Sequence, residues 1–163
     1  MSHIGFDTVE NAKYILENEF QNDISKFMKM YGFNIGQAGS VEVVKWVIET
    51  KKFTRSDWIV CIEGAANGGH LEVLKLISIG AKKRYLSAAA SHAAENNHIH
   101  ILEWLHTNNN IDDDDLDEMF TSALLENNVQ VARFIRSIMD DGHIIDDEYS
   151  SKIWDHVLEN GNS

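Results

Sequence analysis

One nine-residue segment occurs four times in this chain, and this repetition constrains the fold more than any other feature of the sequence. The copies are Gly39–Val47, Gly69–Ile77, Asn97–Leu105 and Asn127–Ile135, and they start 30, 28 and 30 residues apart. In each copy, apolar residues occupy positions 0, +2, +3, +5 and +6 counted from Val41, Leu71, Ile99 and Val129. This spacing places them on one broad face of a helix. Each copy therefore predicts an amphipathic helix that belongs to a repeated structural unit.

A second, inner helix is predicted before three of these segments. Small residues are frequent in Val60–Ala66, Ala88–Ala94 and Glu118–Leu124. Alanine favours helix, and its short side chain lets neighbouring helices approach closely. The intervening turns contain Gly or Asn, which accept the left-handed backbone of a helix C-terminus. The linkers between units lie at 50–57, 79–84, 108–115 and 140–148, and Thr54 with Asp57 has the spacing of a capping box.

These signals predict an all-α solenoid of helical hairpins, with about four repeats and helical caps at both ends. A single unit cannot bury its apolar face alone, so the units must stack on one another. Residues 1–32, with helices near Thr8–Phe20 and Ile24–Phe33, are expected to form an N-terminal cap or a degenerate repeat. Residues 33–140 hold the repeats, and residues 141–163, with a helix near Ser151–Glu159, form a partial repeat or cap.

The segment Ala65–Leu76 resembles the ankyrin repeat, in which an Ala-Ala…Gly-His-Leu-Glu-Val-Val pattern closes the inner helix and opens the outer one. Ala93–His106 is similar to the divergent ankyrin copies that are abundant in large DNA viruses and some microbial eukaryotes. The resemblance covers about residues 33–140. The family's Thr-Pro-Leu-His opening aligns on Val60–Glu63, Ala88–Ser91 and Glu118–Thr121, where Pro and His are absent, and the period is shorter than the family's roughly 33 residues. A generic helical-hairpin solenoid with tighter linkers therefore stays open as an alternative.

The resemblance implies a protein-interaction scaffold that has no chemistry of its own. Stacked repeats would hold linker tips and inner-helix faces in a fixed array for a protein partner. By analogy with the viral copies, that partner could belong to a host cell. An alternative is an architectural fragment of a longer array, which would self-associate through exposed apolar surface near Trp154 and Leu158.

The charge is unevenly distributed along the 163 residues. Residues 1–84 hold 11 Lys+Arg and 10 Asp+Glu (+1), whereas residues 85–163 hold 3 and 16 (−13), so the net charge of −12 arises entirely from the second half. Such a surface repels nucleic acid and anionic lipid, and it favours a basic or mixed-charge protein partner. The apolar runs are too short to span a bilayer. The single cysteine and the lack of a basic and apolar leader predict an intracellular, cytoplasmic setting, or the host cytoplasm if the chain is viral.

The predicted partner-binding residues are linker charges. If the repeats stack, the basic residues of two successive linkers would lie side by side and form a basic ridge, next to an acidic run in the third linker. The alternative is that these are ordinary solvated loop charges. The basic ridge comprises Lys51, Lys52, Arg55, Lys82, Lys83 and Arg84, and the acidic run comprises Asp112, Asp113, Asp114 and Asp115.

The sequence predicts no metal site, cofactor or enzymatic activity. Four histidines occur within 15 residues (His92, His98, His100 and His106), but no cysteine accompanies them, and His98 and His100 would not share a helix face. The acidic run lacks the alternating ligands and the glycine of a calcium loop. No phosphate-binding loop or nucleophile motif occurs. Cys61 and the four tryptophans are expected to pack in the core. A metal-dependent His/Asp function stays a third alternative.

Overall fold

The computed structural model describes residues 6, 8–50, 55–79, 83–108, 110–139, 152 and 154. Across these ranges the regular secondary structure is helical, and no strand occurs in them, so the prediction of an all-α protein is confirmed for the described part of the chain. The helices are α1 (Val9–Phe20), α2 (Ile24–Gln37), α3 (Val41–Thr50), α4 (Arg55–Asn67), α5 (Leu71–Ser78), α6 (Lys83–Glu95), α7 (Ile99–Thr107), α8 (Asp113–Leu125) and α9 (Val129–Ile138).

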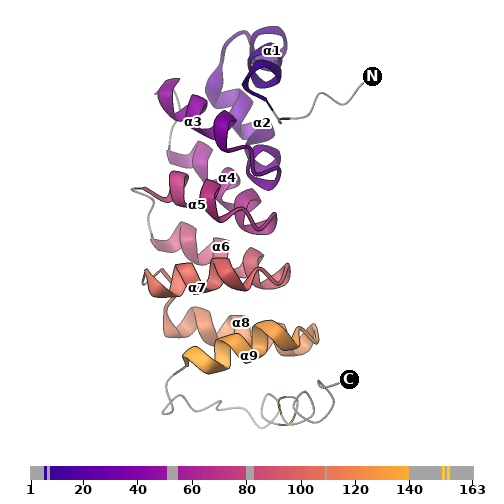
Figure 1. The fold of residues 1–163 in the computed structure, drawn as a ribbon, viewed down its shortest axis with the longest axis vertical. Helices are drawn as coiled ribbons and strands as arrows, with labels where there is room; N and C mark the ends of the chain where they lie inside the picture. The colour runs from indigo at the N-terminus through magenta and orange to yellow at the C-terminus, as the bar shows by residue number, and fades with distance from the viewer. Residues whose placement is uncertain are drawn as a thin grey trace.

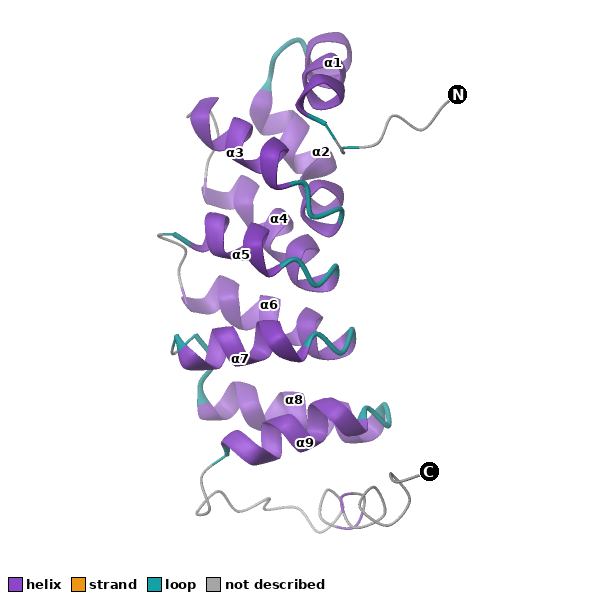
Figure 2. Ribbon diagram, in the orientation of Figure 1, coloured by secondary structure: helices purple, strands orange, loops and turns teal. Residues whose placement is uncertain are grey.

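The helices that follow α1 are arranged in pairs along the long axis of the molecule (Figure 1). Each pair, α2–α3, α4–α5, α6–α7 and α8–α9, consists of two contacting helices joined by a short turn. Successive first helices contact one another in the order α2, α4, α6 and α8, and α3 contacts α5 as α7 contacts α9. Figure 2 shows the turns within the pairs on the same side of the molecule.

The turn within each pair has the same hydrogen-bond pattern. Gly39, Gly69, Asn97 and Asn127 have positive φ angles between 56° and 76°. Each donates its backbone N–H to the carbonyl three residues earlier, and the following residue donates to the carbonyl five residues earlier, as in the bond from His98 to Ala93 (2.8 Å). This pair of hydrogen bonds is the Schellman motif, which satisfies the last carbonyls of a helix. The predicted left-handed Gly and Asn turns are confirmed.

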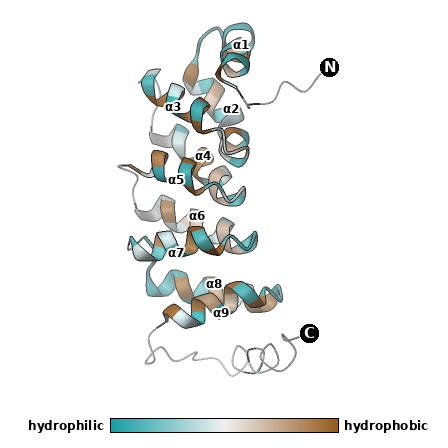
Figure 3. Cartoon of the chain, in the orientation of Figure 1, coloured by the Kyte–Doolittle hydropathy of each residue, from teal (hydrophilic) through white to brown (hydrophobic). Residues whose placement is uncertain are grey.

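The outer helices α3, α5, α7 and α9 bury the predicted apolar face. Positions +2, +3 and +6 of each copy are fully or almost fully buried, whereas positions 0 and +5, such as Leu71 and Trp104, are half-buried. Figure 3 shows the hydrophobic and hydrophilic colours alternating within these helices. The buried set is Val43, Val44, Val47, Val73, Leu74, Ile77, Ile101, Leu102, Leu105, Val131, Ala132 and Ile135.

The first pair begins earlier than the sequence suggested. The helix expected over Ile24–Phe33 continues to Gln37 as α2, so the expected boundary at residues 32 and 33 falls inside this helix. Helix α2 packs closely on α4, because glycines stand where the two backbones meet. A Cβ added at Gly36 would touch the carbonyl oxygen of Cys61, and one added at Gly64 would touch that of Phe33. Helix α2 also contacts α3 and forms the first pair with it, and among the described residues α1 precedes the four pairs.

The capping box predicted at Thr54 and Asp57 is described in part. Thr54 of the expected capping box lies outside the described residues, and its partner Asp57 is fully buried, with its carboxylate accepting from the Ser25 hydroxyl at 3.0 and 3.2 Å. Asp57 thus links α4 to α2.

Of residues 141–163, Lys152 and Trp154 are described, and Trp154 is half-buried against Phe120 of α8, with ring centroids 5.5 Å apart.

Candidate interaction surface

The basic ridge falls mostly outside the described part of the chain. Lys51, Lys52 and Lys82 lie outside the described residues. Arg55 begins α4, whereas Lys83 and Arg84 begin α6. The basic residues therefore occur at equivalent ends of two contacting helices, and the ridge formed by their side chains stays a prediction.

The acidic run divides into two kinds of residue. The Asp112 side chain accepts from the Asp115 backbone N–H at 3.2 Å, and Asp115 accepts in return from the Asp112 N–H at 3.1 Å, which closes a capping box at the start of α8. Asp115 also accepts from the Ser87 hydroxyl of α6. Asp113 and Asp114 are exposed in the same first turn, where the helix dipole favours negative charge. Only this second pair is available to a partner without loss of the cap.

Charges on the outer helices are compensated within the chain. On α3, Lys45 Nζ lies 2.8 Å from a carboxylate oxygen of Glu42, and on α5 Lys75 Nζ lies 3.1 Å from that of Glu72. Both pairs are exposed and contribute little to stability. They nevertheless leave these two outer helices nearly neutral, in contrast to the start of α8.

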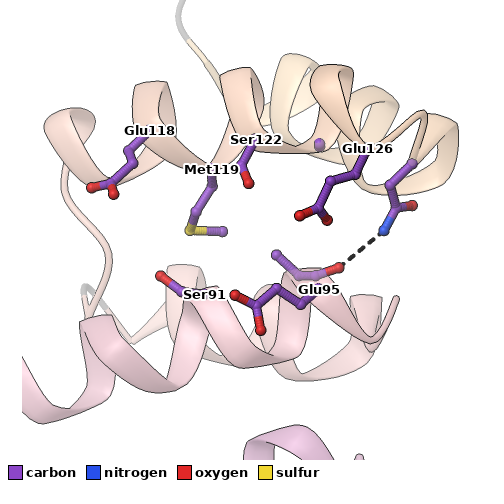
Figure 4. Close-up of a pocket in the computed structure, with 9 residues that line it drawn as sticks. Ser91, Glu95, Glu118, Met119, Ser122 and Glu126 are labelled. Atoms are coloured by element: carbon purple, nitrogen blue, oxygen red, sulfur yellow. Dashed lines mark hydrogen bonds between the residues drawn. The ribbon is translucent and has the colours of Figure 1, made fainter.

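A cavity of about 100 Å³ opens between α6 and α8 (Figure 4). We call it the α6–α8 notch. Figure 4 shows Ser91 and Glu95 on α6 opposite Glu118, Met119, Ser122 and Glu126 on the side of α8. Ala94, Ala123 and Asn128 complete the lining, and the Asn128 amide donates to the carbonyl oxygen of Ala94 at 3.0 Å. No pattern in the sequence indicated this site, although Glu95 and Glu126 lie beside the predicted Asn-containing turns.

Two of the four clustered histidines, His98 and His100, contact the preceding pair. His98 Nε2 lies 2.9 Å from the carbonyl oxygen of Asn67, and His100 Nε2 lies 3.0 Å from that of Gly69. The expectation that His98 and His100 point to different sides is wrong: both rings reach one turn, with centroids 5.9 Å apart. The reason is that His98 precedes α7 with non-helical φ and ψ, so helical spacing does not apply to it. Within the described ranges, no three His, Cys, Asp or Glu side chains are grouped to hold a metal ion.

Cys61 is a buried thiol, as predicted for a residue of the inner helix. It is fully buried in α4, and this burial raises its pKa to about 12. Neither a catalytic thiolate nor an exposed redox thiol is compatible with this environment.

We expect the Cys61 thiol to be unreactive toward a thiol-specific disulfide reagent at pH 8 unless the protein is denatured, in which case one equivalent reacts per chain. The thiol ionises near its ordinary pKa when unfolded and only near 12 when folded, so stability falls as the pH rises above about 9. Thiol titration with and without urea measures the first effect, and thermal melts between pH 7 and 10 measure the second. Rapid labelling of the native protein would contradict the buried placement.

Comparison with known proteins yields no family model, curated protein or solved structure that matches the chain. Among the described helices, none is both long and apolar enough for a bilayer crossing.

Proposed function

We propose that this chain is a non-enzymatic protein-interaction scaffold made of ankyrin-like helical-hairpin repeats. The observation that carries the proposal is the regular contact between successive pairs. Side chains at the start of two outer helices form hydrogen bonds with the end of the inner helix of the preceding pair. His98, before α7, bonds to Asn67 of α4, and Asn128, before α9, bonds to Ala94 of α6. His70 and His98 also pack against Gly39 and Gly69, where an added Cβ would meet their rings. The resemblance of Ala65–Leu76 to the ankyrin repeat supports the same interpretation.

The mechanism that we propose is rigid presentation. Each pair is fixed to its neighbours by a continuous core and by these turn contacts. A partner would therefore bind a preformed surface without the entropic cost of ordering loops. The excess of carboxylates in residues 85–163 favours a partner with basic or mixed charge, in a reducing intracellular compartment.

The alternative of an architectural, self-associating fragment has less support. It requires an exposed apolar end that includes Trp154 and Leu158. Trp154 is half-buried, and its ring packs against Phe120 at the edge of the core of this chain. Leu158 lies outside the described residues.

An affinity capture from cell lysate at low and moderate salt tests the proposal. The baits are the wild type, the basic-ridge variant Lys82→Glu/Lys83→Glu/Arg84→Glu, and the control Lys29→Glu, which reverses an exposed charge on α2. We expect a distinct protein to be retained by the wild type and the control, and to be reduced at least about fivefold by the ridge variant. Circular dichroism verifies that each bait folds.

Two outcomes would count against parts of this proposal. Retention of nothing except copies of the bait would contradict the scaffold function and favour the architectural alternative. Equal retention by all three baits would keep the scaffold function but reduce the basic ridge to solvated linker charge.

A further inference from the structure

The α6–α8 notch exists because the spacing between inner helices differs along the stack. Between α2 and α4, glycines bring the two backbones into contact. Between α6 and α8, the buried side chain of Met119 occupies the interface, and α8 makes far fewer close contacts with α6 than α4 makes with α2. The resulting volume of about 100 Å³ is several times the roughly 10–15 Å³ that one water needs. A side chain of a partner can therefore enter it.

The walls of the notch are rich in hydrogen-bond acceptors. Glu95 projects from α6, whereas Glu118 and Glu126 project from the side of α8 (Figure 4). The Asn128 side chain is the amide donor in the lining, and its N–H is already bonded to the carbonyl oxygen of Ala94. Its oxygen accepts from the Val131 N–H at 3.4 Å. Apart from the hydroxyls of Ser91 and Ser122, the lining offers no free side-chain donor. This composition suits a ligand that only donates, as the side chains of lysine and arginine do.

The carboxylates of the notch are not compensated by basic side chains of the lining. No Lys or Arg is among the nine lining residues, and the ring of His92, which contacts Glu95 at 3.5 Å, is the basic group closest to them in sequence. On α3 and α5, by contrast, a lysine three residues later pairs with the glutamate. The three carboxylates are exposed, so a cation at the notch would be attracted by several negative charges together.

The apolar part of its lining distinguishes this notch from an ordinary acidic patch. Ala94, Ala123 and Met119, which are almost fully buried, line the notch together with the carboxylates. A metal ion needs ligands that converge on one point, and no such group occurs among the described residues. A long side chain with an aliphatic stem and a charged head fits both the apolar part of the lining and the carboxylates.

We propose that the α6–α8 notch binds the basic side chain, arginine or lysine, of an extended segment of a protein partner. This inference rests on the proposed scaffold function and names the chemistry of its ligand. Bidentate hydrogen bonding to carboxylates favours arginine over lysine. The acidic residues of the first turn of α8 attract the same segment electrostatically and raise its rate of encounter.

Titration of the ¹⁵N-labelled chain with a defined peptide tests the notch. The probe is the pentapeptide acetyl-Gly-Ser-Arg-Ser-Gly-amide, and the comparison peptides carry lysine or norleucine in place of arginine. We expect amide shifts that are largest at Ser91, Glu95, Ser122 and Glu126, with no shift from the norleucine peptide. In a Glu95→Gln/Glu126→Gln variant, binding should weaken at least about fivefold, because two charge pairs are lost. Glu103→Gln, an exposed glutamate on α7, is the matched control and should bind like the wild type.

Three results would overturn the inference. One is equal binding by the notch variant and the control, the second is a set of shifts centred on Asp113 and Asp114, and the third is competition by millimolar Ca²⁺ with the same shift pattern. Captured protein that the Glu95→Gln/Glu126→Gln bait retains as well as the wild type would contradict the notch and leave the scaffold function intact. Peptide binding at the notch without any captured protein would support the notch and contradict the scaffold function.

Discussion

Replacing Gly64 or Gly36 with alanine is expected to destabilise the protein by about 3 kcal/mol, and to lower the melting temperature by roughly 6–12 °C. At Gly64 the new methyl group would collide with the carbonyl oxygen of Phe33, and at Gly36 with that of Cys61. Both obstructing atoms belong to helix backbone and cannot rotate away. Helices α2 and α4 would have to separate and lose part of their packing. Thermal and urea unfolding followed by circular dichroism measure the effect.

The sign of this change makes it a sharp test. In an isolated helix, alanine is favoured over glycine by about 1 kcal/mol, so helix propensity predicts stabilisation. Asn34→Ala, at an exposed position of α2, is the control and should be neutral or slightly stabilising. A higher melting temperature for Gly64→Ala would contradict the close approach of α2 and α4.

The parts of the fold that the sequence predicted depend on local rules. A helix of 3.6 residues per turn fixes which positions of each copy face inward, so the burial of Val73, Leu74 and Ile77 follows directly from their spacing. The left-handed turns at Gly69 and Asn97 follow from the few residue types that accept this backbone. In both cases the residues that determine the local structure lie within about ten positions of one another in the sequence.

The parts that were missed depend on contacts between units. The role of Gly32 and Gly36 in α2 depends on Val60 and Cys61 of α4, which a Cβ added at these glycines would meet, and no pattern within α2 reveals those neighbours. The expected boundary at residues 32 and 33 lies inside α2, which resembles the other first helices in its packing on α4 and not in its residue types. The notch depends on the distance between α6 and α8, which no pattern within either helix specifies.

Phe27→Ala is expected to destabilise the protein by about 3–5 kcal/mol, because a fully buried aromatic ring leaves a cavity. The Phe27 ring has three aromatic neighbours, Phe6, Phe20 and Tyr31, with centroids 5.8–6.1 Å away. This cluster attaches α1 to α2 and covers the first pair. Tyr14→Ala, which removes a ring that is 56% exposed on α1, is the matched control and should change stability by less than about 0.5 kcal/mol.

The location of the damage distinguishes stacked units from a single cooperative core. If each pair is stabilised mainly by its neighbours, the loss of Phe27 should weaken hydrogen-exchange protection in α1 and α2 first, and protection in α8 and α9 should change little. Exchange measured by mass spectrometry on wild type and variant reads out each helix separately. An equal loss from α1 to α9 would mean that the pairs unfold together, and it would contradict the local distribution of stability expected here even if the total destabilisation is as expected.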